Sequence, residues 1–456
     1  MDQVDGEPSS HQPVVHYTKP ILASIGTVLI DAFDSPPRPI IDPVVVSSKI
    51  LGLPTSAAIT TPTLPTPPSP SNPSGTTTST SSSSSSVALS NNIHHQPLSV
   101  PPHLITPITS PVPSVGPSTP QLSLDDIPSP NAEDVYEMLG GGALYALVGA
   151  RFWLSPKQLR TLVDRSPEDE PNDLPIEVED KLKSLGEDIW VWNRGKGTKM
   201  TRARIRYEGD IRFFQPIVKA PHRTIAQINS SPLHGAEYLH ISPPYSPENV
   251  ATLLDEIDSL KKLDPERSWS PKIVFEPTPP SCHPGQKEWL ERILSRIQVL
   301  SPNHEEIFSF YSIPLMEFSD PDLKPTVEKL IKHLVSDVGI GEDGKGIVIV
   351  RCGRLGACVG TKLHGLKWCP AYFTGQEESK VRDVTGAGNA FLGGYIAGLS
   401  LSDGDPYEAL LYATVSASFV VEQFGLPILS QVGDDKEEWN GDSPYRRLES
   451  LGKRVE

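Results

Sequence analysis

Charged residues are absent from one long stretch of this 456-residue chain: no Asp, Glu, Lys or Arg occurs from Ile50 to Leu124. The stretch is rich in Pro, Ser and Thr and contains the run TTTSTSSSSSS. A segment of this kind cannot bury enough apolar surface to offset the entropy that ordering costs. We therefore predict a disordered insertion over residues 50–130, which excludes this part of the chain from the folded domain.

Cysteine is also scarce: the four cysteines are Cys282, Cys352, Cys358 and Cys369, and no two of them have CxxC spacing. This usage fits reduced thiols in a cytosolic protein better than a disulfide framework. The N-terminal MDQVDGEPSSHQP lacks a secretory pattern, and no apolar run approaches the ~20 residues of a membrane helix. We expect a cytoplasmic protein without a membrane partner.

The charge balance is acidic, with 40 basic and 56 acidic residues and a formal net charge of −16. Nucleic acids are bound mainly through clustered positive charge, so we expect no nucleic-acid partner. A local basic pocket for a nucleotide remains compatible with this balance.

Strand and helix patterns alternate through the rest of the chain. We predict a buried strand over residues 20–26, a small-residue helix over 143–150 and a strand pair over 198–214. The charged residues 155–190 are predicted to be peripheral and partly helical. From Tyr238 onward, regular alternation is typical of a mostly parallel sheet covered on both faces. The predicted organisation is one α/β domain from residues 20–49 and 131–434, with flexible tails at residues 1–19 and 435–456.

The segment Asp383-Val384-Thr385-Gly386-Ala387-Gly388-Asn389 carries the strongest chemical signal. It precedes a helix predicted over residues 387–399, and unpaired N–H groups at a glycine-rich helix start attract anions. A simple helix-capping turn is the alternative, but the length of the motif favours an anion site. Asn389 stands where a general base would face the anion, and an amide is no base near neutral pH.

Asn303 and Glu306 follow an apolar strand and allow two interpretations. Asn-x-x-Glu is a capping box, in which each side chain bonds the backbone N–H of the other residue. The same spacing places a carboxylate where it could organise a hydrated Mg²⁺, which keeps waters and binds through one or two carboxylates. The local sequence does not decide between the two.

Three further positions are candidates for ligand contact. Gly353 and Gly356 follow the apolar strand 346–350, where glycine lets a nucleotide approach the backbone. An ordinary tight turn explains these two glycines equally well. Asp31 follows the first strand and is either a ligand for a substrate hydroxyl or a loop carboxylate, and the local sequence favours the loop.

Together and in this order, the motifs resemble the ribokinase or PfkB family of carbohydrate kinases. The resemblance is strongest in the signature Asp383–Phe391, which Leu-Gly-Gly follows, and it covers about residues 20–49 and 131–430. Trp368–Tyr372 further resembles the fungal maintenance-of-killer-like branch. The supporting motifs are Gly140–Ala150, Asn303–Glu306 and the strand and turn Val348–Ala357.

The resemblance implies a three-layer α/β/α ribokinase-like sandwich with a small β lid, to which residues 198–214 contribute. It implies transfer of the γ-phosphoryl group of ATP to a hydroxyl of a sugar or nucleoside, with Mg²⁺, and allows a homodimer formed through the lid. The implied anion hole is Gly386, Ala387 and Gly388 beside Asn389, and the implied substrate contacts are Asp31, Gly140, Gly141 and Tyr145. The implied ATP contacts are Asn303, Arg351, Gly353, Gly356, Asp383, Thr385 and Ser416, and Glu306 would hold the metal through water.

Three residues depart from the family pattern. Asn389 replaces an aspartate base, Tyr145 stands about where a substrate-binding asparagine is usual, and Arg351 replaces a threonine. A general base contributes ~10²–10⁴-fold to the rate, whereas phosphoryl transfer depends mainly on positioning and charge stabilisation. The sequence therefore supports two functions: a sugar or nucleoside kinase weakened by Asn389, or a non-catalytic nucleotide-binding pseudokinase that serves as a scaffold.

Overall fold

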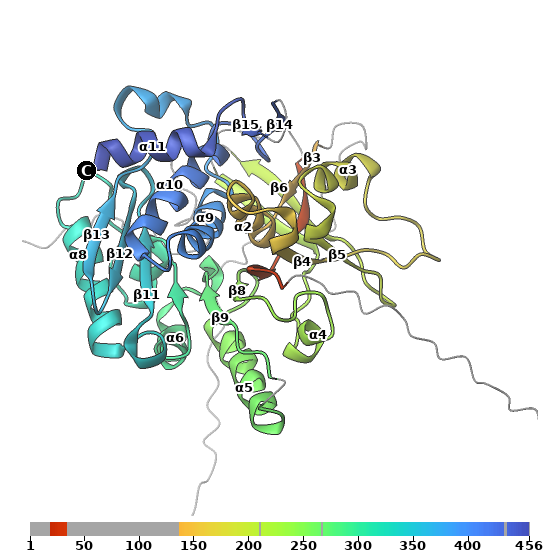
Figure 1. Ribbon diagram of the computed structural model, residues 1–456, viewed down its shortest axis with the longest axis horizontal. Coiled ribbons are helices and arrows are strands. Elements are labelled where there is room, and N and C mark those ends of the chain that lie inside the picture. Colours follow the sequence, from red (N-terminus) through yellow and green to blue (C-terminus); the bar gives the residue numbers. More distant parts are fainter. Residues whose placement is uncertain (1–18, 34–135, 209–210, 266–267, 433–435, 456) are drawn as a thin grey trace, which may run out of the picture. The chain divides into compact units, whose positions relative to one another are not determined.

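A nine-stranded sheet forms the centre of the fold (Figure 1). The computed structural model describes residues 19–33, 136–208, 211–265, 268–432 and 436–455. The predicted insertion at residues 50–130 lies outside the described residues, as does the predicted tail at residues 1–19 apart from Lys19.

The strand order of the central sheet is β13-β12-β11-β10-β9-β8-β1-β4-β5. All neighbouring strands from β11 to β5 are parallel, and β12 and β13 extend one edge in antiparallel fashion. The predicted parallel sheet is therefore confirmed. The bounds are β1 Leu22–Ile25, β4 Leu159–Asp164, β5 Trp190–Asn193, β8 Tyr238–Ile241, β9 Lys272–Phe275, β10 Val299–Leu300, β11 Ile347–Arg351, β12 Ala357–Thr361 and β13 Gly365–Cys369.

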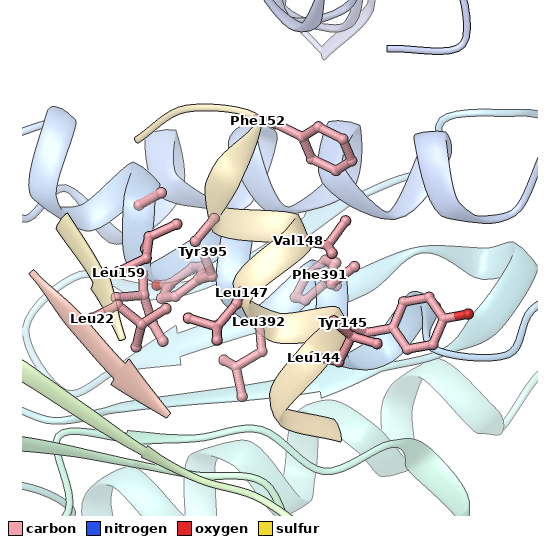
Figure 2. Packing of buried hydrophobic residues seen from close by; sticks show 14 of the residues in the cluster. Leu22, Leu144, Tyr145, Leu147, Val148, Phe152, Leu159, Phe391, Leu392 and Tyr395 are labelled. Atoms are coloured by element: carbon pink, nitrogen blue, oxygen red, sulfur yellow. The ribbon is translucent and has the colours of Figure 1, made fainter. Parts of the chain in front are cut away.

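Helices cover both faces of this sheet. Successive residues of a strand point to opposite faces, so neighbouring residues pack into different cores. Leu22 packs into one core cluster with α2, α9 and α10 (Figure 2), whereas its neighbour Ala23 packs into a second cluster with α5, α6 and α8. The three-layer α/β/α sandwich is thus confirmed. The helix bounds are α2 Gly142–Arg151, α3 Ile176–Ser184, α4 Ile225–Asn229, α5 Pro247–Leu263, α6 Lys287–Leu294, α7 His304–Phe310, α8 Leu323–Lys332, α9 Ala387–Leu401, α10 Pro406–Val420 and α11 Pro444–Val455.

A second sheet, in the order β3-β2-β6-β7, is the small β lid that the resemblance implies. Its strands are β2 Leu29–Phe33, β3 Tyr136–Gly140, β6 Thr201–Glu208 and β7 Ile211–Val218. β2 begins only a few residues after β1 ends, so one short connection carries the chain from the central sheet into the lid. The predicted strand pair at 198–214 corresponds to β6 and β7, and residues 209–210 of its turn lie outside the described residues.

Residues 155–190 are not peripheral as predicted. β4 lies directly beside β1 in the central sheet, and β5 pairs with β4 at the sheet edge. Leu159 and Thr161 of β4 are buried. The sequence did not predict this strand, because a short buried strand between two charged loops shows little hydrophobic periodicity.

The C-terminal residues form part of the folded body, in contrast to the predicted tail at 435–456. Residues Glu437–Trp439 form β15, which pairs with β14 (Leu429–Gln431), and α11 follows. Trp439 and Leu451 are completely buried. The amphipathic face of α11 was overlooked because charged residues dominate its sequence. Among the described helices, none has the length and apolar character that a membrane crossing requires.

Candidate functional site at the start of α9

The glycine loop enters α9 with the backbone geometry of an anion site. Gly386 is the N-cap of α9 and has a left-handed backbone (φ +79°). The backbone N–H of Thr385 donates to Asp383 Oδ1 at 2.9 Å, which fixes the turn before the helix. The N-terminus of this 15-residue helix carries the partial positive charge of the helix dipole.

Tyr145 packs against this loop. A Cβ atom at Gly386 would lie 2.4 Å from the Tyr145 ring, so only glycine leaves room for the ring. The ring is buried and leaves α2 on the side away from Leu22 and Leu159 (Figure 2). The tyrosine therefore fills space beside the loop, and the structure brings Tyr145 and Gly386 together.

The start of α2 lies against the start of α9. Gly141 has φ +110°, and the backbone N–H of Gly142 donates to Thr27 Oγ1 at 2.9 Å. A Cβ atom at Gly142 would lie 3.0 Å from Ser242 Oγ and 3.2 Å from Asn389 Nδ2. Glycine at position 142 therefore leaves room for the close approach of the two helix starts.

Asp31 sits in the lid, and its side chain lies beside a glycine of the neighbouring strand. It lies in the middle of β2 and is buried, and a Cβ atom at Gly140 of β3 would lie 2.4 Å from its Oδ2 atom. Asp31 is thus a strand residue, not the loop carboxylate that the local sequence favours. Gly140 leaves the space that the carboxylate occupies.

Asn389 is bound to a carboxylate that the sequence analysis did not identify. Asn389 Nδ2 donates to Glu276 Oε2 at 2.7 Å. Glu276 directly follows β9 at the carboxyl edge of the sheet and is almost completely buried. The amide therefore holds Glu276 and offers no basic group.

Glu276 is held by two further donors. Arg351 Nη1 lies 2.8 Å from Glu276 Oε1, and His240 Nε2 lies 3.3 Å from Glu276 Oε2. Burial raises the pKa of Glu276, but the Arg351 guanidinium and the bonds from His240 and Asn389 outweigh burial and lower it below its ordinary value. Glu276 is therefore a carboxylate anion at neutral pH.

Ser24 extends this network, and its order resembles a hydrolytic triad. Ser24 Oγ lies 2.9 Å from His240 Nδ1, and His240 in turn contacts Glu276. Ser24 and His240 stand side by side on β1 and β8 and are completely inaccessible to solvent. A nucleophilic serine must reach its substrate, so this arrangement is a structural network that orients Glu276.

Arg351 is the centre of the charged cluster. Besides Glu276, its Nη2 atom lies 3.5 Å from Glu306 Oε2 and donates to the carbonyl oxygen of Ser301 at 2.9 Å. A Cβ atom at Gly388 would lie 1.9 Å from Arg351 Nη1. The guanidinium therefore rests directly against the first turn of α9.

Asn303 and Glu306 form the capping box of α7. Asn303 N donates to Glu306 Oε2, and Glu306 N donates to Asn303 Oδ1, both at 2.7 Å. Glu306 is buried, which raises its pKa to about 7, although Arg351 and the Asn303 N–H oppose this shift. The structure thus establishes the capping interpretation of this motif.

The residues present do not fit a Mg²⁺ ion bound directly by a cluster of protein side chains. Among the described residues there is no group of three His, Cys, Asp or Glu side chains that could hold a metal. Glu306 already accepts a backbone N–H, and the Arg351 cation lies between Glu306 and Glu276. A divalent cation placed here would be repelled by the guanidinium.

Gly353 and Gly356 form the tight turn after β11. Both have positive φ values, +49° and +90°. A Cβ atom would lie 2.9 Å from Phe318 at Gly353 and 2.0 Å from the Cys369 carbonyl oxygen at Gly356. The turn interpretation accounts for both glycines.

Ser416 is not brought to the site. It is completely buried in α10, accepts a hydrogen bond from Trp153 Nε1 at 2.8 Å and donates to the Gly149 carbonyl oxygen at 3.0 Å. Both bonds join α10 to α2 and the residues after it. The hydroxyl is therefore a packing contact and is inaccessible to a nucleotide.

Glu276, His240 and Ser24 are the site residues that sequence reasoning missed. One signal could have found Glu276: it follows the predicted strand 272–275, and ligands of parallel sheets bind at the carboxyl ends of strands. Ser24 and His240 lie inside apolar strands and carry no such signal. Only the pairing of β1 with β8 brings them together.

Comparison with known proteins agrees with this arrangement. The profile of the pfkB family carbohydrate kinases matches residues 197–430. The chain belongs to this family. It is 29% identical over 344 residues to an uncharacterized protein of Schizosaccharomyces pombe, which covers 71% of this chain and 89% of the relative. It is 27% identical over 330 residues to Protein MAK32 of Saccharomyces cerevisiae, over 68% of this chain and 84% of the relative, which supports the maintenance-of-killer-like branch of the pfkB family.

Solved structures show the same fold at low identity. Adenosine kinase from Schistosoma mansoni, in complex with 2-fluoroadenosine, is 12% identical with a TM-score of 0.52, covering 91% of this chain and 98% of that chain. Ribokinase from Giardia lamblia is 16% identical with a TM-score of 0.50, covering 71% and 90%. These likenesses confirm the ribokinase-like fold of this pfkB family member.

Proposed function

We propose that this chain binds a sugar or nucleoside in the carbohydrate-kinase fold and has lost rapid phosphoryl transfer, which makes it a pseudokinase. One observation carries the proposal: the side chain at the base position is an amide that donates to Glu276. Gly386 at the start of α9 and Asp31 on a lid strand support a ligand site of the family type around this amide. Binding and chemistry are therefore separable in this chain.

The family and its neighbours support the ligand class. The matched family is that of carbohydrate kinases, and a neighbour of the same fold is an adenosine kinase bound to 2-fluoroadenosine. Asp31 is a buried carboxylate beside Gly140, and a carboxylate of this kind accepts hydrogen bonds from ligand hydroxyls. Sugars and nucleosides both present such hydroxyls.

The experiment is a thermal-shift screen of the full-length protein with sugars and nucleosides, followed by a product assay with each ligand that stabilises it. The assay contains ATP and Mg²⁺ and compares the wild type with Asn389→Asp. We expect a stabilising ligand and no phosphorylated product from the wild type. Rapid phosphorylation by the wild type would overturn the proposal.

A kinase with a relocated base is the second candidate, and Glu276 favours it. Its carboxylate lies one hydrogen bond from the usual base position, at 2.7 Å from Asn389 Nδ2. The lowered pKa of Glu276 and its three donors argue against it, because a carboxylate that is already satisfied is a weak proton acceptor. Loss of product formation in Glu276→Gln would establish this candidate.

A further inference from the structure

Arg351 lies between two buried carboxylates, a position in which kinases commonly use a metal ion. We propose that Arg351 is the resident cation of this site and that the chain binds a phosphate-bearing ligand there without a divalent metal. The inference rests on the proposed function in one respect only: the ligand approaches the start of α9, where the proposed sugar or nucleoside site also lies.

The cation is fixed by contacts from the residues that follow β9 and β10 and from Glu306 of α7. Glu276 follows β9, Ser301 follows β10, and Arg351 ends β11. Its two terminal nitrogens contact Glu276 at 2.8 Å, Glu306 at 3.5 Å and the Ser301 carbonyl oxygen at 2.9 Å. A group held at this many points is preorganised, so little entropy is lost when a ligand binds to it.

Unused donors point to an oxyanion as the ligand. Within the described residues, Arg351 Nε and Ser301 Oγ are buried and have no hydrogen-bond partner. An unsatisfied buried donor is costly, and a phosphate oxygen bonded to the Arg351 guanidinium would offset part of that cost. Ser301 is completely buried and would not contact the ligand itself. The guanidinium also lies against Gly388, so the N–H groups of the first turn of α9 lie beside the same space.

Arg351 is the more exposed member of its ion pair with Glu276. The side chain of Arg351 keeps 14% of its surface exposed, whereas that of Glu276 keeps 3%. An arginine fork suits the geometry of phosphate oxygens. The ligand class is therefore a phosphate monoester or anhydride, as found in nucleotides and in sugar phosphates.

The test is calorimetry of the full-length protein with ADP, once in EDTA and once in excess Mg²⁺. We expect dissociation constants within about twofold of each other, because the cation belongs to the protein. Adenosine and ribose 5-phosphate form two further arms. Binding of ribose 5-phosphate but not ADP would support the phosphate site and would show that its ligand is a sugar phosphate and not a nucleotide.

Two variants test Arg351 in opposite directions. Glu276→Gln removes the carboxylate that shares the guanidinium, so the ligand should bind about tenfold tighter. The double variant Glu276→Gln/Arg351→Gln removes both charges together and should lose about tenfold or more relative to Glu276→Gln. Arg354→Gln is the matched control, because Arg354 is exposed three residues away and stacks over Phe318, and it should leave binding unchanged.

Four outcomes would overturn the inference. Two concern the ligand: adenosine binds as tightly as ADP, or neither phosphate compound binds. The other two are that Mg²⁺ tightens ADP binding about tenfold or more, or that the double variant binds ADP as tightly as Glu276→Gln. These outcomes leave the proposed function intact, since that depends on sugar or nucleoside binding without product. Conversely, phosphorylated product would overturn the proposed function whatever the metal dependence of binding.

Discussion

The frame of the pocket and its charged centre differ in how far they keep the features of a kinase. The frame consists of the glycine loop before α9, the glycines before α2 and the lid strand with Asp31. Its backbone geometry matches the motifs closely, including the left-handed Gly386. In the charged centre, by contrast, Glu276 accepts a hydrogen bond from Asn389 and forms an ion pair with Arg351. Under the proposed function, the fold keeps its ligand site while the charged side chains at the centre pair with one another.

Removing the central cation should have the largest effect on stability. Arg351→Gln leaves Glu276 buried without its charged partner, so the free energy of unfolding should fall by about 3–5 kcal/mol. The double variant Glu276→Gln/Arg351→Gln should recover most of this loss. Urea unfolding measures both, and a single variant as stable as the wild type would show that the ion pair does not hold the centre together.

A substitution in the frame should cost less. Gly386→Ala combines a positive φ with a Cβ atom 2.4 Å from the Tyr145 ring, so we expect a loss of about 2–3 kcal/mol. Gly365→Ala is the matched control, because Gly365 has φ +76° and nothing within 4 Å of its Cβ position. Unfolding of the two variants isolates the contact with Tyr145, and equal losses would contradict that contact.

The pH dependence of stability separates the two carboxylates of the centre. The pKa of Glu306 is raised from 4.5 to about 7, so the folded state holds this proton more tightly than the unfolded state. Its contribution is therefore greatest below pH 4.5 and is lost as the pH rises through about 7. Glu276, with a lowered pKa, contributes in the opposite sense: its stabilisation is present at neutral pH and lost in acid.

Glu306→Gln tests this sign, because glutamine keeps an acceptor for the Asn303 N–H and has no proton to lose. Relative to the wild type, the variant should gain stability as the pH rises from 5 to 7.5. Urea unfolding at several pH values measures the difference. A difference that stays constant over this range would show that Glu306 titrates in the ordinary acidic range.

The smallest expected effect concerns Ser416, which lies outside both regions. Ser416→Ala leaves the buried indole N–H of Trp153 without its acceptor, so stability should fall by about 1–2 kcal/mol. Affinity for ADP should be unchanged, because the hydroxyl faces α2. Weaker ADP binding in a variant of normal stability would place Ser416 at the nucleotide after all.

Sequence motifs predicted the loop before α9 and the glycine-rich start of α2, because each depends on local backbone geometry. They placed Asp31 wrongly in a loop, whereas it lies in strand β2. The loop before α9 and most of the parallel strands follow from short-range patterns of glycine, polar and apolar residues. The same patterns left the Asn303–Glu306 motif open between a capping box and a metal site. The charged centre could not be predicted in the same way. Glu276, His240 and Arg351 come from three strands far apart in sequence, and only the order of those strands in the sheet brings their side chains together.

The most direct test of the account measures phosphoryl transfer from ATP to a stabilising ligand. It compares the wild type with Glu276→Gln and includes Asn389→Asp, which restores a carboxylate at the base position. If Glu276 is an internal counter-ion, neither the wild type nor Glu276→Gln should form product above the uncatalysed rate. A wild type that forms product, together with a loss of about 10²–10⁴-fold in Glu276→Gln, would show instead that Glu276 is a working general base.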